Sequence, residues 1–291
     1  MPTHTLDGKR IIFIGNSYIY WGNVTHTVHP KVCEQSEREG DTGYFYQICL
    51  ANGENVSVCN WTFGSHGLHH LLGDPCAAGV GCDGVDHLSF LLDRHFDYVV
   101  FCPGGGPVSE AHFEQNAAQI LSLFKAANPN AKFVCLGALG QYGFSSFKLP
   151  QEKVRAHYKE LAKQGVTIAD WGTFVYEIMQ GKRKVEGATE PFDRNSFVVC
   201  RNEADQFHPN PLSGYIASLL LYCLLSGKPA FGQPYAFACD GGVHPSFDAE
   251  NFVKKNYAYE NAQTNYPAIF ASRDTMAALQ KAIDIFLREN R

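Results

Sequence analysis

The chain has 291 residues, a length that suits one large α/β domain or two small ones. Hydrophobic residues make up 45% of it, which is ample material for a core. The formal net charge is -5 and basic residues form no long run, so neither a nucleic acid nor an anionic membrane is expected as a partner. The longest apolar stretch, Ile216–Leu225, is too short to span a bilayer.

Strand-like and helical patterns alternate along the chain. We predict strands near 10–14, 55–60, 97–102, 132–137 and 166–169. We predict helices near 20–38, 66–72, 85–94, 109–127, 151–164, 171–180, 211–225 and 273–289. The alternation is typical of the α/β class and predicts a single doubly wound, flavodoxin-like parallel sheet of about five strands with helices on both faces.

Residues suited to chemistry follow several of the predicted strands. Ser17 comes after the apolar run Ile11–Ile14, Gly64 lies after the second strand, and Gly104–Gly106 follow the third. Ligands of parallel sheets bind beyond the carboxyl ends of the strands. We therefore expect these three segments to gather at one edge of the sheet and to form a site there.

Gly15-Asn16-Ser17 places a serine at the turn from the first strand into a helical segment. Such a serine is a candidate nucleophile, although a serine at a helix start commonly caps the helix instead. Gly15 lets the backbone turn sharply, and the amides after Ser17 favour developing negative charge. A flavin phosphate bound in this turn is an alternative, but it leaves Asp205 and His208 without a role.

Asp205 and His208 lie three residues apart, just before Pro209. A serine hydroxyl is a weak nucleophile until a base takes its proton, and histidine is the side chain type best suited to that role, which makes His208 the candidate base. Asp205 would orient that imidazole and stabilise the imidazolium that forms. An Asp and a His at this spacing also commonly make a loop hydrogen bond, so the pair gains its meaning from Ser17.

Taken together, these segments resemble the SGNH hydrolases, also called the GDSL-like esterase superfamily. Gly15-Asn16-Ser17 is similar to the first block of that family, with Asn16 where Asp often stands. Residues 205–209 are similar to the last block, which supplies the acid and the base. The continuation over 209–229 and the helix at 279–282 resemble a bacterial branch of SGNH-like proteins, the DUF4886-like group.

The same resemblance assigns an oxyanion hole. The second block of the family supplies a glycine N–H, and Gly64 is the best match, with Gly67 as a rival. The third block normally supplies Asn or Gln, but here the third strand runs into a Pro-Gly-Gly-Gly-Pro loop. Loss of one oxyanion donor typically costs about 10²–10³ in turnover. We expect N–H groups of Gly104 and Gly105 to substitute, with Asn16 as a further oxyanion or substrate contact.

The resemblance implies a serine ester hydrolase in which Ser17 is the nucleophile, His208 the base and Asp205 the orienting acid. The expected substrate is an ester, with an acetyl group on a carbohydrate or small molecule as the preferred hypothesis, and no cofactor is expected. The absent third-block amide leaves an alternative, in which the chain keeps the fold but binds a glycan or metabolite without turnover. The sequence does not indicate the oligomeric state.

Two further groups of residues allow competing interpretations. His66, His69 and His70 cluster on one predicted helix, but their spacing matches no strong zinc motif, so solvated or core histidines are favoured over a metal site. We expect one domain over 1–291, in which residues 229–268 form an aromatic-rich insertion. That insertion either packs over the core or acts as a lid that stacks on sugar rings.

Ten cysteines are many for a cytosolic protein. Six stand in apolar context and are predicted to be small buried hydrophobes, which disfavours them as nucleophiles: Cys49, Cys59, Cys102, Cys135, Cys200 and Cys223. Cys76 and Cys82 flank a glycine-containing loop and either close a small disulfide or stay reduced. The N-terminus shows no apolar signal segment, so we expect reduced thiols and a cytoplasmic location.

Overall fold

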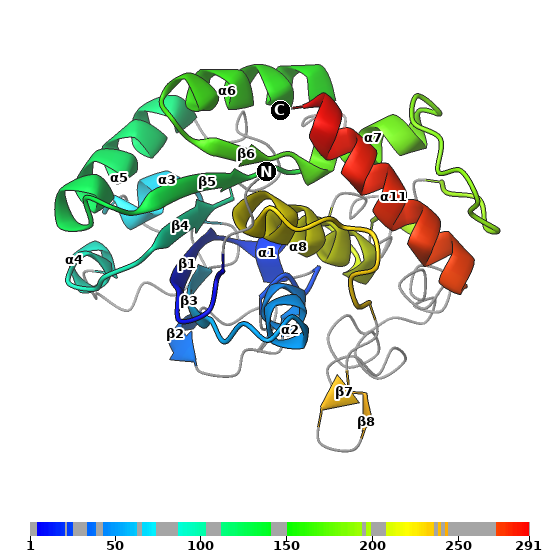
Figure 1. Ribbon diagram of the computed structural model, residues 1–291. Helices are drawn as coiled ribbons and strands as arrows, with labels where there is room; N and C mark the ends of the chain where they lie inside the picture. The colour runs from blue at the N-terminus through cyan, green and yellow to red at the C-terminus, as the bar shows by residue number, and fades with distance from the viewer. Residues whose placement is uncertain are drawn as a thin grey trace, which may run out of the picture.

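The computed structural model describes residues 5–20, 22–25, 34–38, 43–62, 66–73, 87–102, 112–140, 150–193, 196–198, 208–235, 238–239, 242–243 and 272–290. Within these residues one six-stranded sheet has the strand order β2-β3-β1-β4-β5-β6 (Figure 1). Its strands are β1 (Arg10–Gly15), β2 (Glu34–Arg38), β3 (Ser57–Thr62), β4 (Tyr98–Phe101), β5 (Lys132–Leu136) and β6 (Thr167–Ala169). A separate antiparallel pair joins β7 (Ala238–Cys239) and β8 (Gly242–Val243).

Five of the sheet strands are parallel, and they are the five that the sequence predicts. β1 pairs with β3 on one side and β4 on the other, and β5 and β6 follow outward from β4. The chain therefore starts in the middle of the sheet and winds in both directions, which confirms the predicted doubly wound architecture.

The sixth strand, β2, was not predicted. It pairs antiparallel with β3 at the edge of the sheet. The predicted helix over 20–38 is therefore wrong at Glu34–Arg38. This five-residue stretch has the sequence EQSER and carries no apolar periodicity of its own. Its strand conformation depends on the backbone hydrogen bonds that the edge of β3 offers.

Nine helices connect or cover the strands among the described residues. They are α1 (Ser17–Tyr20), α2 (Tyr44–Ala51), α3 (Leu68–Leu71), α4 (His87–Leu92), α5 (Phe113–Ala127), α6 (Gln151–Lys163), α7 (Trp171–Met179), α8 (Pro211–Ser226) and α11 (Arg273–Glu289). The last seven of these agree with predicted helices, whereas α2 was not predicted. None of the helices that the structure describes has the length and apolar character needed to cross a membrane.

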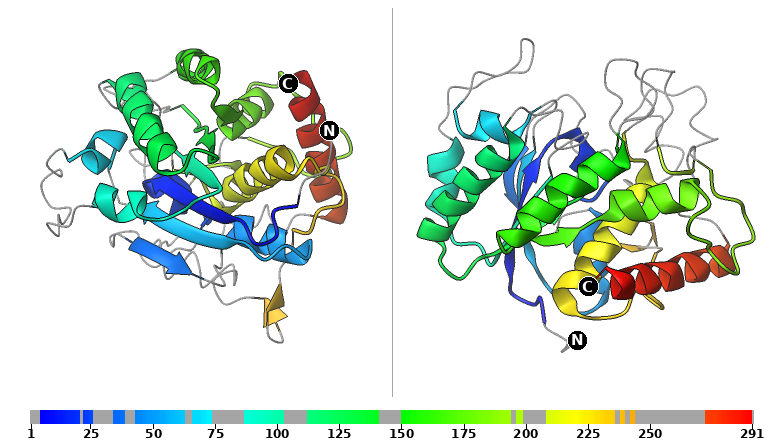
Figure 2. Two further views of the ribbon diagram at one scale, coloured as in Figure 1. Left: turned by 60° about the vertical axis from the view of Figure 1, so that its left-hand side comes forward. Right: turned by 90° about the horizontal axis from the view of Figure 1, so that it is seen from above.

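The two faces of the sheet are covered by separate sets of helices, as the views in Figure 2 show. Side chains of successive residues in a strand point to opposite faces, so Ile11 and Phe13 enter one core and Ile12 and Ile14 enter the other. The first core receives side chains from α2, α7, α8 and α11. The second receives side chains from α3, α4, α5 and α6. A strand buried on both faces explains why β1 is continuously apolar.

Helix α8 is buried on nearly every side, because α2, α7 and α11 all lie against it (Figure 1). Its start is marked by Asn210 as N-cap and Pro211 in the first turn, and its end by Gly227 in the left-handed conformation at φ 72°. The apolar run predicted to be too short for a bilayer is therefore a helix of the core.

The predicted aromatic insertion over 229–268 is described only at 229–235, 238–239 and 242–243. In the first of these stretches the backbone N–H groups of Ala230 and Phe231 donate to the Asp284 carboxylate of α11 at 2.7 and 2.9 Å. The rest of the insertion lies outside the described residues, so its role as a cover or a lid stays a prediction.

Candidate active site

Ser17 is presented by the turn that follows β1. The strand ends at Gly15, and α1 begins at Ser17. The turn is tight, because a methyl group added at Gly15 would lie 2.7 Å from Ile19 Cδ1 and 3.1 Å from the Cys102 carbonyl oxygen. A larger residue at this position would therefore push the Ser17 turn away from the end of β4.

Asn16 holds this turn with its own side chain. Its Oδ1 accepts a hydrogen bond from the Tyr18 backbone N–H at 3.1 Å, and its Nδ2 donates to the His66 carbonyl oxygen at 2.7 Å. The residue is buried. Asn16 was predicted to contact the oxyanion or the substrate, but both of these hydrogen bonds are internal. They tie the Ser17 turn to the segment that follows β3.

His208 precedes α8 on a well-anchored stretch of backbone. Pro209 forms an isolated β-bridge with Val198, and the Asn210 N–H donates to the Phe197 carbonyl oxygen at 3.2 Å. The Asn210 side chain also donates to the Ser196 carbonyl oxygen at 2.8 Å. These contacts fix the residues immediately after His208.

The structure brings Ser17 and His208 together, although 191 positions separate them in the chain. The Ser17 Oγ and the His208 Nε2 lie 2.9 Å apart. The His208 ring also lies against Tyr18, with ring centroids 5.7 Å apart. When Nδ1 carries the ring proton, Nε2 accepts the hydroxyl proton of Ser17, which is the arrangement that general-base activation requires.

Four of the predicted site residues lie outside the described part of the chain: Asp205, Gly64, Gly104 and Gly105. Their roles as orienting acid and as oxyanion donors therefore stay predictions. The described residues reach Thr62 at the end of β3 and resume at His66, which Asn16 contacts.

The three histidines that follow β3 do cluster. The ring centroids of His66 and His70 lie 4.5 Å apart, and those of His69 and His70 lie 3.9 Å apart. The His70 Nδ1 accepts a hydrogen bond from the Gly67 N–H at 3.0 Å, so the turn itself uses this nitrogen. In the part of the chain that the structure describes, no three His, Cys, Asp or Glu side chains gather as metal ligands would.

Five of the cysteines predicted to be buried are buried: Cys49, Cys59, Cys102, Cys135 and Cys223. Burial raises the pKa of the Cys49 and Cys135 thiols well above its ordinary value, so these two stay neutral and are poor nucleophiles. Cys76, Cys82 and Cys200 lie outside the described residues.

One supporting residue was missed by the sequence analysis. Asn210 was included in the continuation that follows the last block but received no role, although its side chain caps α8 by accepting from the Ser213 N–H at 3.0 Å. An Asn directly before a Pro at a helix start is the signal that would have identified it.

Comparison with known proteins finds similarity in structure but not in sequence. No family model matches the chain, and no curated protein matches its sequence. An acetyl-xylooligosaccharide esterase from Geobacillus stearothermophilus superposes with a TM-score of 0.52 at 12% identity, covering 75% of this chain and 95% of the esterase. A catalytic variant of that enzyme, with an aspartate replaced by alanine, gives 0.50 at 13% identity over 74% and 93%.

A protein from Slackia heliotrinireducens named as an SGNH hydrolase gives a TM-score of 0.47 at 16% identity, covering 74% of this chain and 97% of that one. At these identities the similarity concerns the fold. The chain has the doubly wound α/β fold of the Geobacillus esterase, so the fold that the predicted SGNH resemblance implied is confirmed. The closer resemblance to the DUF4886-like group stays a prediction.

Proposed function

We propose that this protein is a serine ester hydrolase of the SGNH type that removes an acetyl group from a carbohydrate or small molecule. The observation that carries the proposal is the 2.9 Å contact between Ser17 Oγ and His208 Nε2. The contact lies where β1 ends, at the edge of the sheet where ligands of parallel α/β folds bind.

The reaction follows from these two side chains. Ser17 Oγ attacks the ester carbonyl carbon while His208 Nε2 takes the hydroxyl proton. The bond to the leaving oxygen then breaks, and His208 returns the proton to the departing alcohol. Water, activated by the same imidazole, attacks the acetyl-serine; acetate leaves and Ser17 recovers its proton.

The remaining groups are proposed from the sequence. Asp205 orients His208 from the Nδ1 side and stabilises the imidazolium. The backbone N–H groups of Ser17 and Gly64 hold the oxyanion, and those of Gly104 and Gly105 stand in for the absent third-block amide. Acetyl-carbohydrate as the substrate class is supported by the esterase of the same fold, whose substrate is an acetylated xylo-oligosaccharide.

The test is hydrolysis of p-nitrophenyl acetate by the wild type and by Ser17→Ala, with fluorophosphonate labelling run alongside. We expect the variant to lose both label and turnover, by at least about 10³-fold in rate, because it lacks the nucleophile. Ser57→Ala is the matched control. Ser57 is also half-buried, but it starts β3 and so lies at the amino ends of the parallel strands, whereas Ser17 follows the carboxyl end of β1.

Acetate release from acetylated xylo-oligosaccharides then tests the substrate class. A Ser17-dependent rate on p-nitrophenyl acetate without release from the sugar would restrict the proposal to small esters. Turnover that survives in Ser17→Ala would refute the assignment of the nucleophile. Sugar binding without any Ser17-dependent turnover would identify a binding protein that retains the fold.

A further inference from the structure

Two buried glycines touch each other between the segment that carries Ser17 and the segment that carries His208. A methyl group added at Gly214 would lie 1.6 Å from the Gly22 carbonyl oxygen and 2.3 Å from its carbon. A methyl group added at Gly22 would lie 2.9 Å from the Gly214 Cα and 3.3 Å from the Pro209 Cβ. The two backbones are therefore in direct contact, and only hydrogen fits between them.

Gly22 belongs to a short segment that is tied on both sides. The Val24 N–H donates to the Ile19 carbonyl oxygen of α1 at 3.1 Å. The Tyr44 N–H, at the start of α2, donates to the Asn23 carbonyl oxygen at 2.8 Å. A displacement of Gly22 is therefore passed on to α1, whose first residue is Ser17.

Gly214 lies in the first turn of α8, six positions after His208. Its N–H donates to the Asn210 carbonyl oxygen at 3.0 Å, and Asn210 is anchored in turn to Phe197. Next to Gly214, the Tyr215 ring packs edge-on against Tyr44 of α2, with ring centroids 6.1 Å apart. A displacement of Gly214 is therefore passed on to the turn that holds His208.

We propose that Gly22 and Gly214 are positioning residues, whose backbone contact sets the distance between Ser17 Oγ and His208 Nε2. The contact joins the two reacting segments on the α8 side of the sheet, and it is too close to accept any side chain. That the glycine contact sets the distance between Ser17 and His208 does not depend on catalysis. That it also sets the reaction rate rests on the proposed function.

The test compares three variants. Gly214→Ala places its methyl against the Gly22 carbonyl and must separate the segments, so the rate of fluorophosphonate labelling per folded molecule should fall by about 100-fold, with a fall in kcat rather than a rise in KM. Gly22→Ala, with its milder 2.9 Å overlap, should have a smaller effect of the same kind and serves if Gly214→Ala does not fold.

Gly172→Ala is the matched control. Its methyl would lie 1.9 Å from the Ala138 carbonyl oxygen, an equally tight backbone contact, but between α7 and the end of β5. It should lower the melting temperature without lowering the labelling rate per folded molecule. An equal loss of labelling rate per folded molecule in Gly172→Ala and Gly214→Ala would mean that any tight backbone contact has this effect, and would overturn the positioning role of Gly22 and Gly214.

A second readout does not depend on turnover. The ¹⁵N resonances of the His208 imidazole, identified by their loss in His208→Gln, should shift in Ser17→Ala because the hydroxyl contact is gone. Gly214→Ala and Gly22→Ala should shift them in the same direction, and Gly172→Ala should not. Unchanged resonances in both glycine variants overturn the inference. A shift in both without any wild-type hydrolysis supports the inference and overturns the proposed function.

Discussion

Asn16 shows how one side chain can hold the turn that carries Ser17. An amide carries both a donor and an acceptor, and Asn16 uses the donor on the His66 carbonyl oxygen and the acceptor on the Tyr18 N–H. An ionised Asp has only acceptors. The choice of Asn rather than Asp at this position thus follows from the direction in which the His66 carbonyl points.

Asn16→Asp should destabilise the protein by about 1–3 kcal/mol at pH 8, because a carboxylate oxygen would face the buried His66 carbonyl oxygen. At pH 5 the loss should be smaller, since a protonated carboxyl can donate where Nδ2 did. Urea denaturation at the two pH values measures the difference. An equal loss at both would argue against the donor role of the amide.

Asn128→Asp is the control for activity. Asn128 is also buried, donates to the Arg94 carbonyl oxygen at 3.1 Å and accepts from the Phe96 N–H at 2.8 Å. Its substitution should cost a similar amount of stability. Only Asn16→Asp should also lower the labelling rate per folded molecule, because only Asn16 adjoins Ser17.

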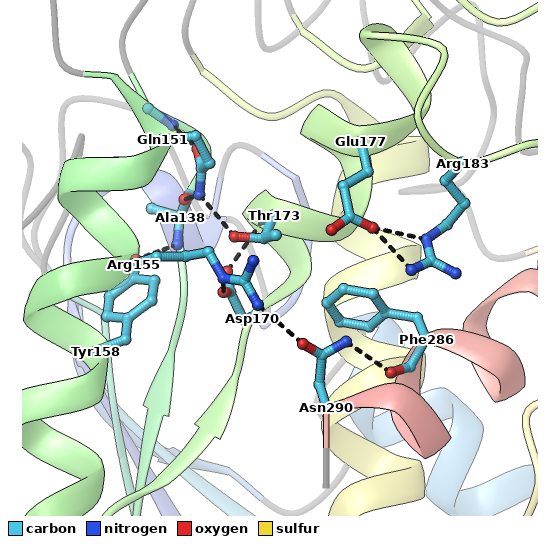
Figure 3. Close-up of polar contacts among 11 residues, drawn as sticks. Ala138, Gln151, Arg155, Tyr158, Asp170, Thr173, Glu177, Arg183, Phe286 and Asn290 are labelled. Atoms are coloured by element: carbon cyan, nitrogen blue, oxygen red, sulfur yellow. Dashed lines mark hydrogen bonds and ion pairs between the residues drawn. The ribbon is translucent and has the colours of Figure 1, made fainter.

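At the scale of elements, the start of α7 carries a carboxylate that is largely withdrawn from solvent. Asp170 follows β6 and caps α7, since its Oδ1 accepts from the Thr173 N–H at 3.0 Å (Figure 3). Burial raises the pKa of Asp170 from 3.8 to about 6, although the Thr173 hydrogen bonds and Arg155, 3.8 Å away, oppose the shift. Asp170 lines a cavity of about 160 Å³ together with Phe286 of α11 and Asn290, the residue that follows this helix.

This pKa predicts the direction of a pH effect. The folded protein binds the Asp170 proton more tightly than the unfolded chain does, so its contribution to stability is fully present below about pH 4 and is lost as pH rises through about 6. Asp170→Asn keeps the acceptor for Thr173 but cannot ionise. It should therefore remove up to about 3 kcal/mol of the decline in stability between pH 4 and pH 7.

Chemical denaturation of wild type and Asp170→Asn between pH 4 and pH 7 measures this contribution. The effects of the other carboxylates cancel when the free energy of unfolding of the variant is subtracted from that of the wild type. A difference that is constant with pH would mean that Asp170 titrates at its ordinary pKa. A wild type that loses stability relative to Asp170→Asn as the pH is lowered would reverse the sign of the proposed shift.

At the scale of the whole molecule, the last helix closes one face of the fold. Side chains from both ends of the chain enter the same core, which receives Leu6 and Ile11 as well as Met276 and Ile283. The described residues at the two ends therefore share one core, which supports the predicted single domain. Helix α11 is the last helix of the chain, and it lies beside α7 and α8 (Figures 1 and 2).

Phe286 is central to this closure. Its ring packs edge-on against Phe174 of α7 at 5.4 Å between centroids. The Arg183 guanidinium lies over the Phe286 ring, 5.0 Å from its centroid (Figure 3). Arg183 is itself held by ion pairs with Glu177 and Glu289. Phe286→Ala should therefore reduce the free energy of unfolding by about 3–5 kcal/mol.

The neighbouring Ile285 is 42% exposed, and Ile285→Ala is the matched control. Its effect should stay within about 1 kcal/mol, since nearly half of the Ile285 surface is already exposed to solvent in the folded protein. Urea denaturation of both variants measures the contrast. Similar losses for the two would show that α11 does not seal the core through Phe286.

The parts of the fold that could be predicted are those with a strong local pattern. β1 is a continuous apolar run because both faces of it are buried, and α8 combines an Asn-Pro start with a Gly end. β2 has neither feature, and its conformation comes from pairing with β3. α2 was missed although most of it is buried, because its residues are apolar without a clear helical period.

The candidate site divides in the same way. The sequence by itself determined which residues are candidates for the chemistry, because a serine after a first strand and a His near an Asp are recognisable by type and context. Only the tertiary structure decided that Ser17 and His208 lie 2.9 Å apart, that Asn16 reaches His66, and that Gly22 touches Gly214. A glycine in a loop and a glycine in a helix look ordinary in sequence, since a close contact between two backbones depends on their placement and leaves no pattern in either segment alone.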